Sequence, residues 1–138
     1  MGAVAGSDVH WVVDPVTQEE IAVPPYASAE QAIRRAAMKR SGRLRFIRMF
    51  PDYGRDYPLW ENGSGNYTVT AADLELSTPL ADALRRWQQR WDDECLDSSE
   101  WSSEQARLDW LRDGAEMCAR LQREVWDFAE VLPEFGAG

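Results

Sequence analysis

The sequence predicts a small α+β domain, in which a small sheet from the N-terminal half packs against a C-terminal helical hairpin. Three observations lead to this fold class. The chain has 138 residues and is 44% hydrophobic, so a single domain can bury a core. Short alternating segments, typical of strands, occur in the first half. Long stretches with apolar residues at spacings of three and four, typical of helices, fill the second half.

The N-terminal part predicts a β-hairpin followed by a helix. In "VHWVVDPVTQEEIAV" two apolar segments flank an Asp-Pro turn. The next stretch, "ASAEQAIRRAAMKR", has a helical composition, and Ser28 and Gln31 have the spacing of a capping box. We therefore expect a hairpin and a helix in residues 1–40. They are either integral to the domain or an extension of a compact unit of residues 41–132, because Met38 opens a stretch that resembles a protein start.

Two further strands are expected in the middle of the chain. The stretch "RLRFIRMF" (43–50) has apolar residues on both faces, which is typical of an internal or covered strand. The stretch "NYTVT" (66–70) follows the turn pair Asn62-Gly63 and is the second candidate.

The second half predicts two helices. One apolar stripe consists of Leu80, Leu84, Trp87, Trp91 and Cys95. A second apolar pattern predicts a helix that continues to Phe128. Gly114 inside that helix costs about 1 kcal/mol relative to alanine, and it is compatible with a close helix contact. Residues 133–138 are expected to form a frayed tail.

The net charge of −9 is concentrated in the second half. Residues 71–138 contain sixteen acidic and seven basic side chains, whereas residues 34–48 contain seven basic side chains and no acidic one. The basic stretch can either contact phosphates or pair with the acidic helices. The acidic remainder of the chain disfavours nucleic acid. No membrane-spanning run or signal-peptide pattern is found, so we expect a cytoplasmic protein with no membrane contact.

The sequence contains no recognisable catalytic, cofactor or metal pattern. His10 is the single histidine, and its position in an expected strand favours a structural role. P-loop, GxSxG and zinc-type Cys/His patterns are missing from the sequence. We therefore predict no catalytic residue, no cofactor and no metal ligand, and a role other than that of an enzyme is favoured.

Tryptophans and carboxylates in the C-terminal half predict a surface that binds a protein. Trp110 and Trp126 fall beside the main apolar pattern, so they either widen the core or are partly exposed. The carboxylates are also compatible with a solvated surface or a site for a hard cation. The residues expected at a partner-binding surface are Trp110, Trp126, Asp93, Asp97, Glu100 and Glu104.

The function favoured by this pattern is a non-enzymatic protein-binding domain, of an immunity or inhibitor type, that captures a basic partner. The alternative is a small-ligand binder or an enzyme that uses the segment 53–60. Its candidate ligand residues are Asp52, Tyr53, Arg55, Asp56, Tyr57 and Trp60. We interpret "FPDYGRDYPLWENGSGNYTVT" as a structural crossing, in which Leu59 and Trp60 fold back onto the helical layer and are buried.

The central part of the chain resembles a set of small uncharacterised bacterial proteins. The shared pattern is RFxxxFPDYG, then PLW, then LS, then RxW, and it lies within residues 43–128. The resemblance supports the domain and implies no activity, cofactor or catalytic residue.

Overall fold

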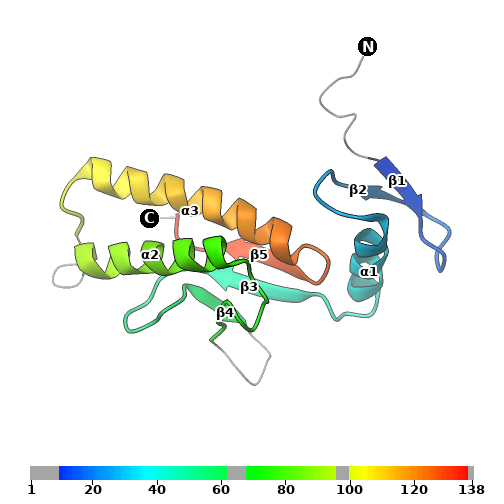
Figure 1. Cartoon of the computed structure of the whole chain (residues 1–138), viewed down its shortest axis with the longest axis horizontal. Helices are drawn as coiled ribbons and strands as arrows, with labels where there is room; N and C mark the ends of the chain where they lie inside the picture. Colours follow the sequence, from blue (N-terminus) through cyan, green and yellow to red (C-terminus); the bar gives the residue numbers. More distant parts are fainter. Residues whose placement is uncertain (1–9, 62–67, 96–99, 137–138) are drawn as a thin grey trace, which may run out of the picture. The chain divides into compact units, whose positions relative to one another are not determined.

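The computed structural model describes residues 10–61, 68–95 and 100–136 (Figure 1). It has an α+β fold with small sheets and two long C-terminal helices, as the sequence predicts. The elements in chain order are β1 (His10–Val13), β2 (Glu20–Val23), α1 (Ala29–Arg40), β3 (Arg45–Met49), β4 (Leu59–Glu61), α2 (Thr78–Cys95), α3 (Glu104–Val125) and β5 (Ala129–Pro133).

The chain divides into two compact units. The first consists of Met1–Arg45 with Trp126–Glu130, and the second consists of Phe46–Val125 with Val131–Gly138. That residues 126–130 group with the N-terminal part was not predictable from local sequence patterns, because this association depends on contacts far apart along the chain.

The first unit contains the predicted hairpin and helix. Strands β1 and β2 pair antiparallel, with His10 opposite Val23. The capping box of α1 is present: the Ser28 hydroxyl accepts from the Gln31 backbone N–H, and the Gln31 side chain accepts from the Ser28 N–H. Val23 and Ala32 are fully buried. The hairpin and the capping box therefore form as the sequence predicts.

Much of the basic stretch 34–48 is paired within the protein. Arg35 donates to the carbonyl oxygens of Trp126 and Ala129 and to the Glu130 carboxylate. Three further ion pairs among the described residues join Arg34 to Asp127, Arg40 to Asp14, and Arg48 to Glu134. Their acidic partners lie in the hairpin turn and after α3, and not on the two long helices as expected. Internal pairing thus accounts for much of the charge that suggested phosphate contacts.

A mixed three-stranded sheet has the order β4-β3-β5, and most of its residues belong to the second unit. Strand β4 is antiparallel to β3. Strand β5 is parallel to β3, because the Arg45 N–H donates to Phe128 O at one end and the Glu134 N–H donates to Met49 O at the other. Strands β4 and β5 were not predicted from the sequence. Of the strand expected at 66–70, Thr68 forms a single bridge to Trp60, and residues 66 and 67 lie outside the described residues.

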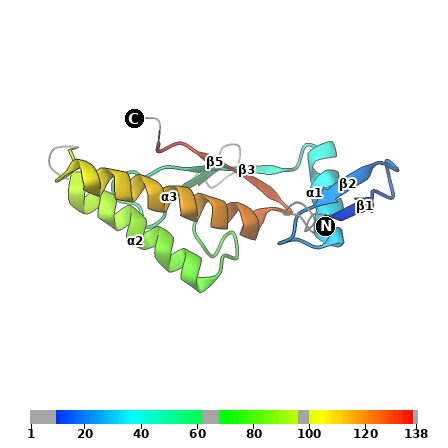
Figure 2. The same ribbon diagram turned by 90° about the horizontal axis from the view of Figure 1, so that it is seen from above.

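The helices α2 and α3 lie side by side on one face of this sheet (Figure 2). Ile47 and Met49 of β3 and Leu84 of α2 are fully buried. The helix α2 contains the whole predicted apolar stripe from Leu80 to Cys95. Ser77 caps its N-terminus, because the Ser77 hydroxyl accepts from the Leu80 N–H. The helix α3 ends at Val125, three residues before the expected Phe128.

The C-terminal segment is packed, whereas the sequence analysis expected it to fray. Phe135 lies edge-on against the rings of Trp87 and Trp110, with centroid distances of 4.9 and 5.8 Å. A Cβ atom at Gly114 would lie 2.6 Å from atoms of both Trp87 and Phe135. Gly114 therefore permits the close helix contact that the sequence predicts, and Phe135 of the C-terminal segment takes part in this contact. Residues 137 and 138 lie outside the described residues.

Candidate functional site

Trp110 lies in the core, although the sequence analysis placed it at a partner-binding surface. Its side chain is 3% exposed, and its ring stacks on Trp87 with a centroid distance of 4.0 Å. Trp87 Nε1 donates to Trp110 O at 2.8 Å, and Trp110 Nε1 donates to Trp87 O at 2.9 Å. The reciprocal bonds satisfy both buried indole N–H groups. This pair joins α2 to α3, so Trp110 acts in stability.

Trp126 is half-buried in the first unit. The guanidinium carbon of Arg35 lies 5.2 Å from its ring centroid, and Tyr26 meets the ring edge-on at 6.1 Å. The predicted acidic residues all belong to the second unit. The described contacts of the Trp126 ring, with Arg35 and Tyr26, are instead within the first unit.

The predicted carboxylates do not form a stripe on one helix, because α2 ends at Cys95 and α3 begins at Glu104. Asp93 and Glu100 are exposed. Glu104 pairs with Arg107 at 2.6 Å, and this hydrogen bond lowers the pKa of the Glu104 carboxyl below its usual value. Asp97 lies outside the described residues.

Two carboxylates that the sequence analysis did not select lie beside Asp93. Glu94 accepts from the N–H and the hydroxyl of Ser102, and so connects the end of α2 to the start of α3. Asp92 accepts from Gln88, and Asp93 accepts from Gln89. We call Asp92, Asp93, Glu94 and Glu100 the acidic end of the hairpin.

Charge at the acidic end opposes the helix dipole. The last turn of α2 contains no basic residue, and three consecutive carboxylates occupy it. The C-terminal end of a helix is its negative pole, so the negative charge of these carboxylates is unfavourable there. A charge arrangement that reduces stability is typical of a surface retained for binding.

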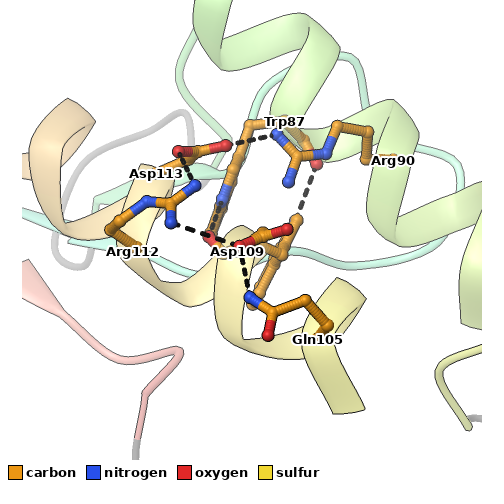
Figure 3. A network of polar contacts seen from close by, with 7 residues as sticks. Trp87, Arg90, Gln105, Asp109, Arg112 and Asp113 are labelled. Atoms are coloured by element: carbon orange, nitrogen blue, oxygen red, sulfur yellow. Dashed lines mark hydrogen bonds and ion pairs between the residues drawn. The ribbon is translucent and has the colours of Figure 1, made fainter. Parts of the chain in front are cut away.

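Further along the hairpin, by contrast, the acidic residues are neutralised. Arg90 of α2 pairs with Asp113 of α3 at 2.7 Å (Figure 3). Arg112 lies between Asp113 and Asp109, at 3.6 and 3.2 Å, and Gln105 donates to Asp109 at 2.9 Å (Figure 3). The unbalanced negative charge of the hairpin is thus concentrated at the acidic end.

Most of the alternative ligand residues have structural roles. The Tyr53 hydroxyl donates to Cys95 O at 3.0 Å, which satisfies a carbonyl at the end of α2. The Asp52 carbonyl accepts from Gln88 Nε2 at 2.8 Å. Tyr57 lies under the guanidinium of Arg85 at 5.9 Å. These contacts connect the turn at residues 52–57 to α2.

Trp60 is buried, as expected, but it lies on the other face of the sheet. Its position opposite Arg48 in the β3–β4 ladder directs it away from Met49, which faces the helices. It is 3% exposed, stacks on Phe50 at 4.9 Å, and donates from Nε1 to Phe50 O at 3.0 Å. Leu59, opposite Met49, is the residue of this pair that reaches the helical layer.

Two of the alternative ligand residues do meet at a cleft. Arg55 and Asp56 line a cleft of about 320 Å³ between their turn and one side of α2. We call it the arginine cleft, and its lining residues are Arg55, Asp56, Asp82, Arg85, Arg86, Gln88 and Gln89. The contributions of α2 share one helical face, because positions 82, 85, 86 and 89 are three and four apart. That spacing predicts a polar face on the helix. It does not predict that the turn with Arg55 and Asp56 lies opposite this face.

Within the described ranges, no three His, Cys, Asp or Glu side chains are arranged so that they could hold a metal ion. His10 is exposed in β1 of the first unit. None of the helices in the described part of the chain has the length and apolar character that a membrane crossing needs.

A family model described as Serratia CdiI immunity protein-like matches residues 45–132, which is more than half of the chain. The match begins at the first residue of β3 and ends within β5, so it includes the three-stranded sheet and both long helices. No curated protein matches the sequence.

Proposed function

The chain belongs to the Serratia CdiI immunity protein-like family, and on that premise we propose that it binds a toxic partner protein and blocks the partner's activity. The observation that carries this proposal is the family match over residues 45–132. An immunity-type, protein-binding role is what the family supports. The identity of the docking surface and the charge of the partner belong to our proposal.

We place the main docking surface at the acidic end of the hairpin, and we propose that a basic region of the partner binds there. Two features support this choice. Three carboxylates occupy the C-terminal turn of α2, where they weaken the helix. In addition, Asp93 and Glu100 are exposed, so they are accessible to a partner. Complementary charge speeds encounter and selects against partners of like charge.

In the test, the full chain serves as bait and captures proteins from a lysate of its native host. Each captured protein is then purified. Cells that express a true partner should stop growing, and co-expression of this chain should restore growth. Calorimetry with the two purified proteins should show a complex of fixed stoichiometry. A captured protein that is harmless to cells, or a toxic one that this chain does not neutralise, would contradict the proposal.

The arginine cleft supports the second candidate function, a small-ligand binder or enzyme. It is a cavity of about 320 Å³, within the size range of small-molecule sites, and it contains Arg55 and Asp56 from the predicted segment. It ranks second because Tyr53 and Trp60, two other residues of that segment, are engaged in hydrogen bonds to carbonyl oxygens of the chain. Binding of a metabolite at the cleft, with no effect on a toxic protein, would favour this candidate.

A further inference from the structure

We infer that the arginine cleft receives an acidic side chain of the partner protein, together with a main-chain N–H group next to that side chain. The inference rests on the proposed function and deepens it, because it adds a second contact of opposite charge to the acidic end. It is based on three features of the cleft as the described residues form it: an acceptor without a hydrogen bond, three guanidinium groups without ion pairs, and the balance of charge.

The unsatisfied acceptor belongs to Gln88. This side chain is 1% exposed, and its Nε2 donates to Asp52 O at 2.8 Å and to Asp92 Oδ2 at 3.3 Å. These two bonds to acceptors fix the orientation of the amide. Its Oε1 accepts no hydrogen bond from the described residues. A buried carbonyl without a donor costs stability, so an occupant that brings an N–H group gains from meeting it.

The guanidinium groups supply the donors for an anion. Among the described residues, Arg55, Arg85 and Arg86 have no carboxylate within ion-pair distance. Aromatic rings hold two of them in place: Arg55 lies 5.4 Å from the centroid of Trp60, and Arg85 lies 5.9 Å from that of Tyr57. A guanidinium stacked on a ring keeps its in-plane N–H groups available for a carboxylate.

The charge balance favours a single carboxylate over a more highly charged anion. The cleft is lined by three arginines and also by Asp56 and Asp82, so its side chains carry one net positive charge. One carboxylate neutralises that charge. Phosphate, with close to two negative charges, would leave an excess and would be repelled by the two aspartates. A peptide segment supplies both the single carboxylate and the N–H that Gln88 requires.

The first experiment probes the cleft without the partner. N-acetyl-glutamic acid N-methylamide, which has one carboxylate and two amide N–H groups, is titrated into the full chain. NMR follows the side-chain N–H signals of Gln88, Arg55, Arg85 and Arg86. We expect saturable shifts of these signals. The uncharged N-acetyl-glutamine N-methylamide should cause no saturable shift, and inorganic phosphate should bind more weakly than the glutamate compound.

Matched variants make the test specific. The double variant Arg85→Gln/Arg86→Gln should bind the glutamate compound at least ten-fold more weakly than wild type. The control Lys39→Gln/Arg123→Gln changes the net charge equally at exposed positions outside the cleft, and it should bind within two-fold of wild type. Arg85 and Arg86 are exposed, so Arg85→Gln/Arg86→Gln should unfold close to the wild-type temperature. The control removes a cation from the last turn of α1 and one from the last turn of α3, so it should unfold at a slightly lower temperature and still bind like wild type.

The second experiment uses the toxic partner that the capture test recovers. Calorimetry should give a Kd at least ten-fold weaker for Arg85→Gln/Arg86→Gln and unchanged within two-fold for the control. If both variants bind this partner as tightly as wild type, the inference is wrong and the proposed function stands. If wild type binds no toxic partner, the proposed function fails, and so does the assignment of the carboxylate to a partner. Phosphate binding as tight as that of the glutamate compound would also overturn the inference, in favour of a free-anion site.

Discussion

Gly114 shows how a single position can reverse an intrinsic preference. Alanine inside a helix is ordinarily more stable than glycine by about 1 kcal/mol. In α3, however, the added Cβ would lie 2.6 Å from Trp87 Cζ2 and from Phe135 Cε2. We expect Gly114→Ala to lower the free energy of unfolding by about 1–3 kcal/mol, as overpacking does. Chemical denaturation measures this. Gly136→Ala, at a site with open space, is the matched control and should change little; a stabilised Gly114→Ala variant would contradict the packing described.

Trp60 tests the interpretation of the segment 50–70 as a crossing. It is 3% exposed, stacks on Phe50 and donates to Phe50 O. Replacement by alanine leaves a large cavity, so we expect Trp60→Ala to cost about 3–5 kcal/mol of unfolding free energy. Thermal or chemical denaturation gives the value. Phe46→Ala, on the same sheet but 51% exposed, should cost far less. A midpoint for Trp60→Ala within a degree or two of wild type would show that the ring is exposed in solution.

At the scale of elements, the β1–β2 hairpin depends on an ionised Asp14. The Val16 N–H, hydrogen-bonded to its carboxylate at 2.8 Å, is the main cause that lowers its pKa below the usual 3.8, and Arg40 at 3.0 Å adds to the effect. Because the folded pKa is depressed, this stabilisation is complete above pH 3.8 and is lost as the pH falls through the folded pKa. The unfolding temperature of wild type should therefore exceed that of Asp14→Asn at pH 5, and the difference should shrink below pH 3.8. A difference that stays constant from pH 5 to pH 2.5 would contradict this role.

The C-terminal turn of α2 should show a conflict between stability and binding. Removal of carboxylates from the negative end of a helix is stabilising, by about 0.3–1 kcal/mol each at low ionic strength. We expect Asp92→Asn/Asp93→Asn to unfold at a higher temperature and yet to bind the toxic partner more slowly. Asparagine can still accept the bonds from Gln88 and Gln89. The control Glu75→Gln/Glu116→Gln removes the same charge from exposed sites away from the acidic end and should leave the association rate close to wild type. A double variant at positions 92 and 93 that associates at the wild-type rate would remove the acidic end from the interface.

At the scale of the whole molecule, the second unit presents two surfaces of opposite charge. The acidic end suits a basic region of a partner, and the arginine cleft suits a carboxylate. Two contacts of opposite sign fix the orientation of a partner as well as attract it.

The charge arrangement predicts that association with the toxic partner is sensitive to salt. Exposed charges are screened beyond about 8 Å at 0.15 M ionic strength. We expect the association rate to fall by about ten-fold or more between low and high salt, with a smaller change in the dissociation rate. Stopped-flow measurements over a salt series give both rates. An association rate indifferent to salt would remove the electrostatic basis of capture.

Elements whose signals are local were predictable from the sequence alone. Three signals rest on residues a few positions apart, so short-range geometry defines them: the capping box at Ser28 and Gln31, the apolar stripe of α2, and the apolar residues on both faces of β3. The concentration of negative charge in the second half was likewise readable from composition.

Tertiary structure alone decided what depends on contacts between distant segments. Strand β4 has three residues, too few for a clear periodic pattern, and β5 is held by pairing with β3 from more than eighty positions earlier. The burial of Trp110 follows from its stack on Trp87, and the arginine cleft follows from the turn at Arg55 facing α2. A helical spacing specifies which residues share a face; what covers that face is set by the path of the rest of the chain.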